Sequence, residues 1–165
     1  MGAAMRRLWL PLAVLGLVVP ALAGAGPSGE TIPLEGNGPG ERLDVTLVQV
    51  VDPAPAEGPG DVPEQDERLV AVQFRLKNTG TAVYKDSPQN GAYLLDTTGQ
   101  RFAGSPRATA AGAEFPGLVT VRPQDTALGF VTFEVPRDAE PAAVQFAMNS
   151  GFADDVGQWA LGSKT

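Results

Sequence analysis

Carboxylates are the side chains in this sequence that are best suited to catalysis or ligand binding. The chain has 165 residues and contains neither Cys nor His. Without an imidazole or a thiol, Ser-His-Asp and Cys-His catalysis are excluded. The Cys and His ligands that zinc and copper sites usually recruit are also missing. Any site must therefore use carboxylates, hydroxyls, amides, basic side chains or aromatic rings.

The most acidic stretch is residues 52–67, DPAPAEGPGDVPEQDE, where four prolines and two glycines predict a long loop. It has no basic residue, and its acids are Asp52, Glu57, Asp61, Glu64, Asp66 and Glu67. Such hard oxygen donors suit calcium, although the spacing matches no EF-hand. Two interpretations stay open, namely a solvated surface loop and a loop that binds calcium or another small ligand.

Paired carboxylates raise the question of glycoside hydrolysis. The candidates are Asp66-Glu67 and Asp154-Asp155. Hydrolysis needs two carboxylates at a defined separation across a sugar-binding cleft, whereas adjacent acids in a Pro-rich or terminal segment are typical of solvated charge. We therefore assign no catalytic, cofactor-binding or metal-ligating residue, and we predict that the protein is not an enzyme.

Aromatic residues offer the other possible chemistry. Tyr84, Tyr93 and Phe102 lie near predicted turns, where they would form a carbohydrate or peptide platform or anchor a corner of the fold. The remaining large aromatics outside the N-terminal segment are predicted to be core residues: Phe74, Phe130, Phe133, Phe146 and Trp159.

Short strands are the elements that must position these residues. In residues 69–78 the apolar side chains alternate with small or polar ones, which is typical of a strand with one buried face. Residues 43–51 also alternate, but the apolar phase shifts after Leu47, which predicts a β-bulge or burial on both faces. Further strands are predicted at 92–96, 101–102, 118–121, 127–135, 143–148 and 157–161.

Turn signals every 8–12 residues complete this pattern, and no long amphipathic helix interrupts it. Seven to nine short strands predict an all-β fold, an antiparallel two-sheet immunoglobulin-like sandwich. No repeat of 20–50 residues is present, so a propeller or β-helix is not expected.

The N-terminal 23 residues are predicted to be a signal peptide. Arg6 and Arg7 precede a twelve-residue apolar run, and Ala21-Leu22-Ala23 is a cleavage motif, with a second candidate cut after Ala25. The apolar run is short for a membrane span. Residues 24–41 are rich in Gly and Pro, which predicts a flexible stalk, so the sandwich is predicted at residues 42–165.

The net charge of the chain limits the classes of partner that it can bind. The whole chain carries 12 basic and 19 acidic residues, a net charge of −7. Cleavage would remove Arg6 and Arg7, leaving 10 basic against 19 acidic residues and a net charge of −9. Such a charge repels nucleic acids and anionic membranes. The absence of Cys excludes a lipid-modified cysteine as an anchor.

Several motifs occur in the order found in one known family. They are Val51-Asp52-Pro53, the strand from Arg68 to Phe74, Asn78-Thr79-Gly80, Tyr84, the turn from Asp96 to Gln100, and the strand from Leu128 to Pro136. Over residues 43–148 the chain resembles the telokin-like, immunoglobulin-type extracellular domains of bacteria, a family without assigned function that includes a small secreted immunogenic protein of mycobacteria. The resemblance implies an exported two-sheet sandwich and transfers no catalytic residue. Members are often lipoproteins, whereas this chain has no cysteine that could carry a lipid.

We therefore expect a non-catalytic, secreted or envelope-associated binding module whose partner is a protein or an envelope component. The alternative is an extracellular domain that binds calcium or another small ligand through residues 52–67. After cleavage, no membrane span is expected, and no cofactor is predicted.

Overall fold

The central strand is β3 (Glu67–Asn78), in which residues 69–72 are apolar and buried on both faces. The computed structural model describes residues 29–162, and the predicted signal peptide lies outside them. Ten strands form within that range. The others are β1 (Thr31–Glu35), β2 (Arg42–Ala54), β4 (Tyr84–Asp86), β5 (Ala92–Asp96), β6 (Arg101–Ser105), β7 (Val119–Val121), β8 (Thr126–Pro136), β9 (Pro141–Ala147) and β10 (Val156–Ala160). The helical turns are η1 (Pro59–Asp61), α1 (Pro88–Gly91) and η2 (Asn149–Gly151).

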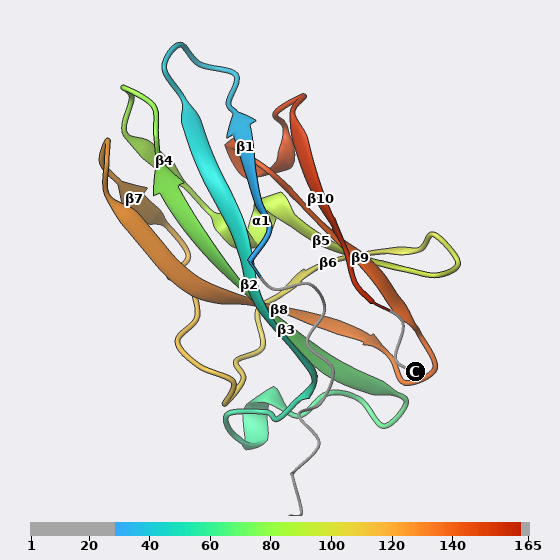
Figure 1. Cartoon of the computed structure of the whole chain (residues 1–165). Coiled ribbons are helices and arrows are strands. Elements are labelled where there is room, and N and C mark those ends of the chain that lie inside the picture. The colour runs from blue at the N-terminus through green and yellow to red at the C-terminus, as the bar shows by residue number, and fades with distance from the viewer. Residues whose placement is uncertain (1–28, 163–165) are drawn as a thin grey trace, which may run out of the picture.

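Eight of these strands are hydrogen-bonded in the order β1-β2-β3-β8-β6-β5-β9-β10, and β4 pairs with β7. Every pairing between the named strands is antiparallel. The strands fold over into a β-sandwich, with β1, β2, β3 and β8 in one layer and β5, β9 and β10 in the other (Figure 1). The predicted all-β, antiparallel sandwich is confirmed, with ten strands rather than seven to nine.

β6 is the strand that connects the two layers. Its first three residues pair with β5, whereas Gly104 and Ser105 pair with Phe133 and Thr132 of β8. Gly104 has to be small here, since a Cβ on it would lie 2.6 Å from the Gln89 side chain and 2.8 Å from the Gln89 carbonyl oxygen. This short strand therefore passes from one layer to the other, and the loop that follows it starts at β8.

The main core lies between the layers and is built around aromatic rings. The ring centroid of Phe74 lies 5.5 Å from that of Phe146 and 5.7 Å from that of Trp159, with tilted and edge-on geometry. Phe133 is equally buried, so four of the five predicted core aromatics lie in this cluster. The fifth, Phe130, is also buried but belongs to a second cluster described below.

β2 contains the predicted irregularity. Its register against β3 shifts between Leu47 and Gln49 and again between Val51 and Ala54. The first shift coincides with the change of apolar phase in the sequence, because one extra residue in a strand inverts the side chains that follow. β2 consequently buries Leu43, Val45 and Leu47 in the main core and Ala54 on the opposite face.

The predicted stalk at 24–41 is wrong for its second half. Thr31–Glu35 is strand β1, whose Leu34 is fully buried, and residues 36–41 form the turn into β2. The Gly and Pro count hid a five-residue edge strand, on which Pro33 is tolerated because one side of an edge strand has no ladder partner. The sandwich therefore starts at Thr31 rather than at residue 42.

β1 and β10, at the two ends of the strand order, lie beside each other. The indole Nε1 of Trp159 donates to the Glu30 carbonyl oxygen at 3.0 Å, and the Glu35 amide donates to Asp155 Oδ2 at 2.8 Å. Side-chain hydrogen bonds thus join the two ends of the sheet where a backbone ladder would otherwise be needed.

Candidate functional site

The outer face of the sheet carries a second apolar cluster, formed where side chains point away from the main core. Its buried members are Ala54, Leu69, Ala71 and Phe130, and its partly buried members are Val51, Ala56 and Ala111. β2, β3 and β8 contribute most of them, whereas Ala56 and Ala111 come from the loops that follow β2 and β6. Two loops therefore pack on this face of the sheet.

Backbone hydrogen bonds hold these loops to the sheet and to each other. The Phe130 amide donates to the Ala113 carbonyl oxygen at 3.0 Å, and the Phe115 amide donates to the Phe130 carbonyl oxygen at 3.1 Å. Between the loops, Glu57 N donates to Ala108 O at 3.1 Å and Ala110 N to Pro55 O at 2.9 Å. We call residues 55–61 and 106–115 the loop surface.

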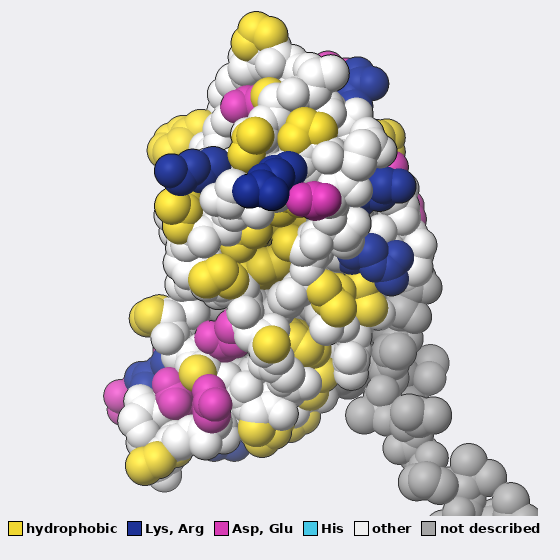
Figure 2. Space-filling model, turned by 90° about the vertical axis from the view of Figure 1, so that its left-hand side faces the viewer, with side chains coloured by type: hydrophobic (Ala, Val, Ile, Leu, Met, Phe, Trp, Pro, Cys, Tyr) yellow, Lys and Arg dark blue, Asp and Glu magenta, His cyan; other side chains and the backbone are white. Residues whose placement is uncertain are grey.

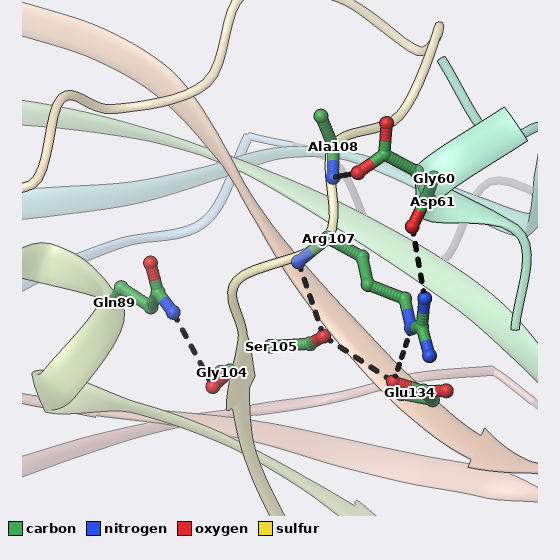
Figure 3. Close-up of polar contacts among 8 residues, drawn as sticks. All are labelled: Gly60, Asp61, Gln89, Gly104, Ser105, Arg107, Ala108 and Glu134. Atoms are coloured by element: carbon green, nitrogen blue, oxygen red, sulfur yellow. Dashed lines mark hydrogen bonds and ion pairs between the residues drawn. The ribbon is translucent and has the colours of Figure 1, made fainter. Parts of the chain in front are cut away.

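Arg107 is the main side-chain link within the loop surface (Figure 3). Its Nε donates to Glu134 Oε2 on β8 at 2.8 Å, and its Nη1 donates to the Gly60 carbonyl oxygen at 3.2 Å. Beside it, the Ala108 amide donates to Asp61 Oδ1 at 2.9 Å. One basic residue thus ties the second loop to the sheet and to η1.

Glu134 also contacts Glu67, and together they form a carboxylate pair. The hydrogen bond to Glu134 raises the pKa of Glu67 above its ordinary value, and burial and nearby acids add to the effect. Burial alone would raise the pKa of Glu134, but hydrogen bonds from Arg107 and Glu67 outweigh it and lower the pKa. Of the two carboxyl groups, Glu67 therefore releases its proton at the higher pH.

A second basic residue, Arg68, closes the base of the acidic loop. Its Nε and Nη2 donate to Asp52 at 2.7 and 3.1 Å. Its remaining donors reach the carbonyl oxygens of Pro136, Arg137 and Ala139. Because the two side chains are only 14% and 6% exposed, this ion pair is shielded from water and fixes where the acidic loop leaves β2.

The loop surface contains a hollow of about 390 Å³, lined by Glu57, Thr109, Ala110, Gly112, Ala113 and Glu114. Thr109 is 2% exposed, and its Oγ1 has no hydrogen-bond partner. Glu114 Oε1 accepts a 2.8 Å hydrogen bond from Thr132 Oγ1, which fixes that carboxylate. Gly112 has a φ of +154° and lies against the Phe130 ring, 2.6 Å from where a Cβ would stand.

The six acids of residues 52–67 do not converge on one point. Asp52 pairs with Arg68, Asp61 accepts from the Ala108 amide, Glu67 contacts Glu134, and Glu57 lines the hollow. Within residues 29–162, no group of three or more Asp, Glu, His or Cys residues is placed to hold a metal ion. The structure thus assigns several of these acids to holding loops in place.

The predicted carboxylate pairs do not form a glycosidase geometry. Asp155 accepts the Glu35 amide at the junction of β1 and β10, which is a structural role. The carboxylate pair that the fold brings together is Glu67 with Glu134, which share a hydrogen bond, and Glu134 is also paired with Arg107. Retaining glycosidases need a separation of about 5–5.5 Å, leaving room for the sugar.

The three turn-proximal aromatics do not form a common platform. Tyr84 is 5% exposed and belongs to the main core, where burial and the adjacent Asp86 raise the pKa of its hydroxyl. Phe102 is half-buried against the same core. Tyr93 lies under the Arg101 guanidinium, 4.1 Å from its ring centroid, which is a cation–π contact.

Sequence reasoning missed the residues of the loop surface that follow β6. It predicted strands at 101–102 and 118–121 and assigned no strand and no site to the residues between them. Phe115, in that interval, packs on Gly129 and against the main core. Arg107, Thr109 and Glu114 gave no signal, because each acquires its role only when the loop crosses β8.

Another hollow of about 400 Å³ lies at the tip of the β1–β2 turn and includes Glu35, Glu41 and Arg42 among its lining residues. Its charged groups are already engaged. Arg42 pairs with Glu35, and Glu41 Oε2 accepts hydrogen bonds from Gly38 N at 2.9 Å and Asn149 Nδ2 at 3.0 Å. This hollow therefore offers a ligand fewer free charges than the hollow of the loop surface.

Comparisons with known proteins place the fold but not a family. No family model matches the sequence, and no curated protein matches it. A secreted protein of Mycobacterium tuberculosis, MPT63, has a similar structure with a TM-score of 0.56 and 15% identity, over 79% of this chain and 92% of that one.

A second similar structure is ycdA of Bacillus subtilis, a protein provisionally named a lipoprotein. It has a TM-score of 0.61 and 13% identity over 84% of this chain, and this chain spans 40% of its length. At such identities the likeness establishes the sandwich fold alone. Among residues 29–162, no helix is long and apolar enough to cross a bilayer.

Proposed function

We propose that this protein is a non-catalytic module that works outside the cytoplasm, in the medium or at the cell envelope, and binds a partner through the loop surface. The N-terminal pattern of a signal peptide supports export. The similar structures include one secreted protein and one provisionally named lipoprotein, which agrees with that location. The finer assignment to the telokin-like, immunoglobulin-type family belongs to this same proposal.

The observation that carries the proposal is the fixed geometry of the loop surface. Two loops of different origin are tied together by backbone hydrogen bonds and by Arg107. Loops that only connect strands need no such cross-links, whereas loops held on a rigid sheet are where binding residues usually lie. The hollow at Thr109 gives this surface a concave feature for recognition.

The distribution of charge also favours an oriented partner. Figure 2 shows the side of the molecule where β4 and β7 lie: most Lys and Arg side chains are in its upper half, Asp and Glu cluster at the lower left, and hydrophobic side chains lie between. Since η1 lies at the bottom of Figure 1, the acidic loop belongs to that lower end. Opposite charge at two ends of one face steers and orients association.

Site-specific photo-crosslinking tests this proposal. A photoreactive residue at the exposed Ala110, in cells that make the full chain, should give one discrete crosslinked species. The matched control is the same residue at Gln158, which is exposed on β10. The expected result is a species from Ala110 alone. The same species from both positions, or none from Ala110, would contradict a partner at the loop surface.

A further inference from the structure

We infer that this protein associates head to tail with further copies of itself, the outer face of the small β4–β7 sheet binding residues 62–66 of the next copy. The inference goes beyond the proposed function, since neither surface includes a residue of the loop surface. We call residues 62–66 the acidic segment. The residues that face outward from β4 and β7 or flank these strands form what we call the β4–β7 face: Val83, Lys85, Leu118, Thr120 and Arg122.

The β4–β7 face is set by the pairing of two short strands. Lys85 pairs with Thr120, whereas their neighbours Tyr84 and Val121 are buried in the main core. Because side chains alternate along a strand, Lys85 and Thr120 point away from that core, and both are exposed. This side of the small sheet is therefore open to a partner.

Exposed apolar side chains and bases without an ion pair occur together on the β4–β7 face. Val83 is 50% exposed and Leu118 is 55% exposed. Lys85 and Arg122 are exposed too, and neither forms an ion pair within residues 29–162. Figure 2, which looks onto the side of β4 and β7, shows Lys and Arg in its upper half with hydrophobic side chains near them. Such a surface suits a partner that offers carboxylates beside an apolar side chain.

The acidic segment has this complementary composition. Val62 is 58% exposed, so the two surfaces hold three of the six exposed large hydrophobic residues within residues 29–162. Glu64 and Asp66 are exposed and form no ion pair in the same range, and Arg137 contacts the segment through a backbone carbonyl oxygen. A hydrogen bond and burial raise the pKa of Glu67, and the charges of Asp66 and Glu64 add to this, which shows that negative charge is in excess here.

The two surfaces lie at opposite ends of β3, so they cannot meet within one copy. The acidic segment ends where β3 begins, whereas Asn78, the last residue of β3, donates from Nδ2 to the Val121 carbonyl oxygen of β7 at 2.9 Å. A strand of 12 residues is about 35 Å long. Figure 1 shows β4 and β7 near one end of the molecule and η1, which precedes the segment, at the other. The complementary surfaces can therefore pair only between copies.

This contact is heterologous, because each copy binds with one surface and is bound by the other. Such contacts build open chains or closed rings rather than a dimer. Both surfaces are small, which predicts a weak contact that needs high protein concentration. The net charge of −7 repels copies at long range. Salt at about 0.15 M screens this repulsion beyond about 8 Å and weakens pairs in contact less, so it is the condition for the test.

The test measures the weight-average mass of the protein, purified as the cell makes it, by light scattering and sedimentation velocity. We expect the mass to rise with concentration and to exceed that of two chains at millimolar protein. K85Q/R122Q and E64Q/D66N should each weaken self-association at least about fivefold, because each removes the charges of one surface. Both should keep the melting temperature of the unmodified protein, since the four side chains are exposed.

Matched controls separate the contact from the effect of net charge. R42Q/R101Q removes two exposed bases outside the β4–β7 face, and E140Q/D154N removes two exposed acids outside the acidic segment. Each control changes the net charge as much as the corresponding test variant does. Self-association of both controls should stay within about twofold of the unmodified protein.

A mixture of the two test variants identifies the head-to-tail arrangement. E64Q/D66N keeps the β4–β7 face, and K85Q/R122Q keeps the acidic segment. An equimolar mixture should therefore form a complex of two chains and nothing larger, although each variant alone associates poorly.

Protein that stays monomeric at millimolar concentration would overturn the inference and leave the β4–β7 face to a different acidic partner. A dimer that grows no further, controls as impaired as the test variants, or a mixture that remains as single chains would also overturn it. Crosslinking from Ala110 tests the proposed function separately. Self-association without that crosslink would remove the proposed function alone, and the crosslink without self-association would remove only this inference.

Discussion

At the scale of single residues, Arg68 shows how much one side chain can organise. All five of its N–H donors are used, two on Asp52 and three on carbonyl oxygens at the end of β8 and just after it. The planar guanidinium fits this arrangement, and a lysine ammonium cannot reproduce it.

We therefore predict that R68K lowers the free energy of unfolding by about 2–3 kcal/mol, since the buried carboxylate of Asp52 keeps fewer donors. The control is R137K, at an exposed arginine whose Nε donates to the Gln65 carbonyl oxygen, and it should cost less than about 0.5 kcal/mol. Urea unfolding followed by Trp fluorescence measures both. Equal effects from the two variants would show that Arg68 is not a special contact.

The carboxylate pair gives a prediction with a definite pH dependence. A raised pKa means that Glu67 binds its proton more tightly in the folded state, so its contribution favours folding at low pH and is lost as pH rises through the folded pKa. The E67Q side chain cannot ionise, so it keeps the hydrogen bond to Glu134 at every pH and loses no stability as pH rises.

E67Q should thus be more stable than the unmodified protein at pH 7, and the difference should shrink as pH falls toward the ordinary glutamate pKa of 4.5. Melting temperatures between pH 4 and pH 8 test this. E64Q, at a neighbouring exposed acid, serves as the control and should show a flatter difference. A constant advantage of E67Q at every pH would refute the shared proton.

At the scale of elements, close backbone approach fixes how the turns pack. Gly80 follows β3, and a Cβ there would collide with the Gly40 carbonyl oxygen and lie 2.8 Å from the Arg42 amide. The Thr81 amide donates to that same Gly40 oxygen at 2.9 Å, and the Gly80 amide donates to Arg42 O at 3.2 Å. This contact holds the β1–β2 turn against the end of β3.

G80A should therefore destabilise the protein by more than about 2 kcal/mol, because backbone cannot move aside cheaply. G117A is the matched control, since Gly117 has a negative or extended φ and open space around its Cβ position. That variant should be neutral or slightly stabilising. Chemical denaturation measures the stability of both variants. Equal denaturation midpoints for G80A and G117A would mean that the backbone of the turn can shift to accept a Cβ at residue 80 at little cost.

The strands show which elements a sequence can define. β3, β5 and β8 were predicted within two residues of their observed bounds, because period-two alternation needs only local information. β1 and β4 were missed since each is short and gains its stability from neighbours. Tyr84 was predicted to lie near a turn, as part of a ligand platform or as a corner anchor. In the structure it belongs to β4, which pairs with β7, and it is buried in the main core.

At the scale of the whole molecule, the sandwich depends on β1 as well as on the strands that the sequence made obvious. Leu34 is buried at 1% exposure, and the Glu30 carbonyl oxygen accepts the Trp159 indole N–H. A chain that starts at Arg42, the predicted boundary, would lose both contacts and uncover the adjacent edge of β2.

We predict that a chain starting at Arg42 is at least about 3 kcal/mol less stable than one starting at Gly29, which is the scale for loss of one buried leucine with its cavity. Urea unfolding compares the two chains. The L34A variant of the longer chain should reproduce a large part of this loss of stability. Equal midpoints for the two chains would show that β1 contributes nothing to the core.

The sequence by itself determined the all-β class, the central strands and the buried aromatic set, because alternation and turn residues act over a few positions. It also determined the net negative charge and the absence of His and Cys, which limit the kinds of catalytic and metal-binding site that the protein can have. Only the tertiary structure decided that β1 joins the sheet and that Glu67 meets Glu134. It alone brought Thr109 and Glu114, from the loop after β6, beside Glu57 from the loop after β2. The last two contacts join residues more than about 50 positions apart, and they depend on the path of loops across a sheet, which local patterns do not encode.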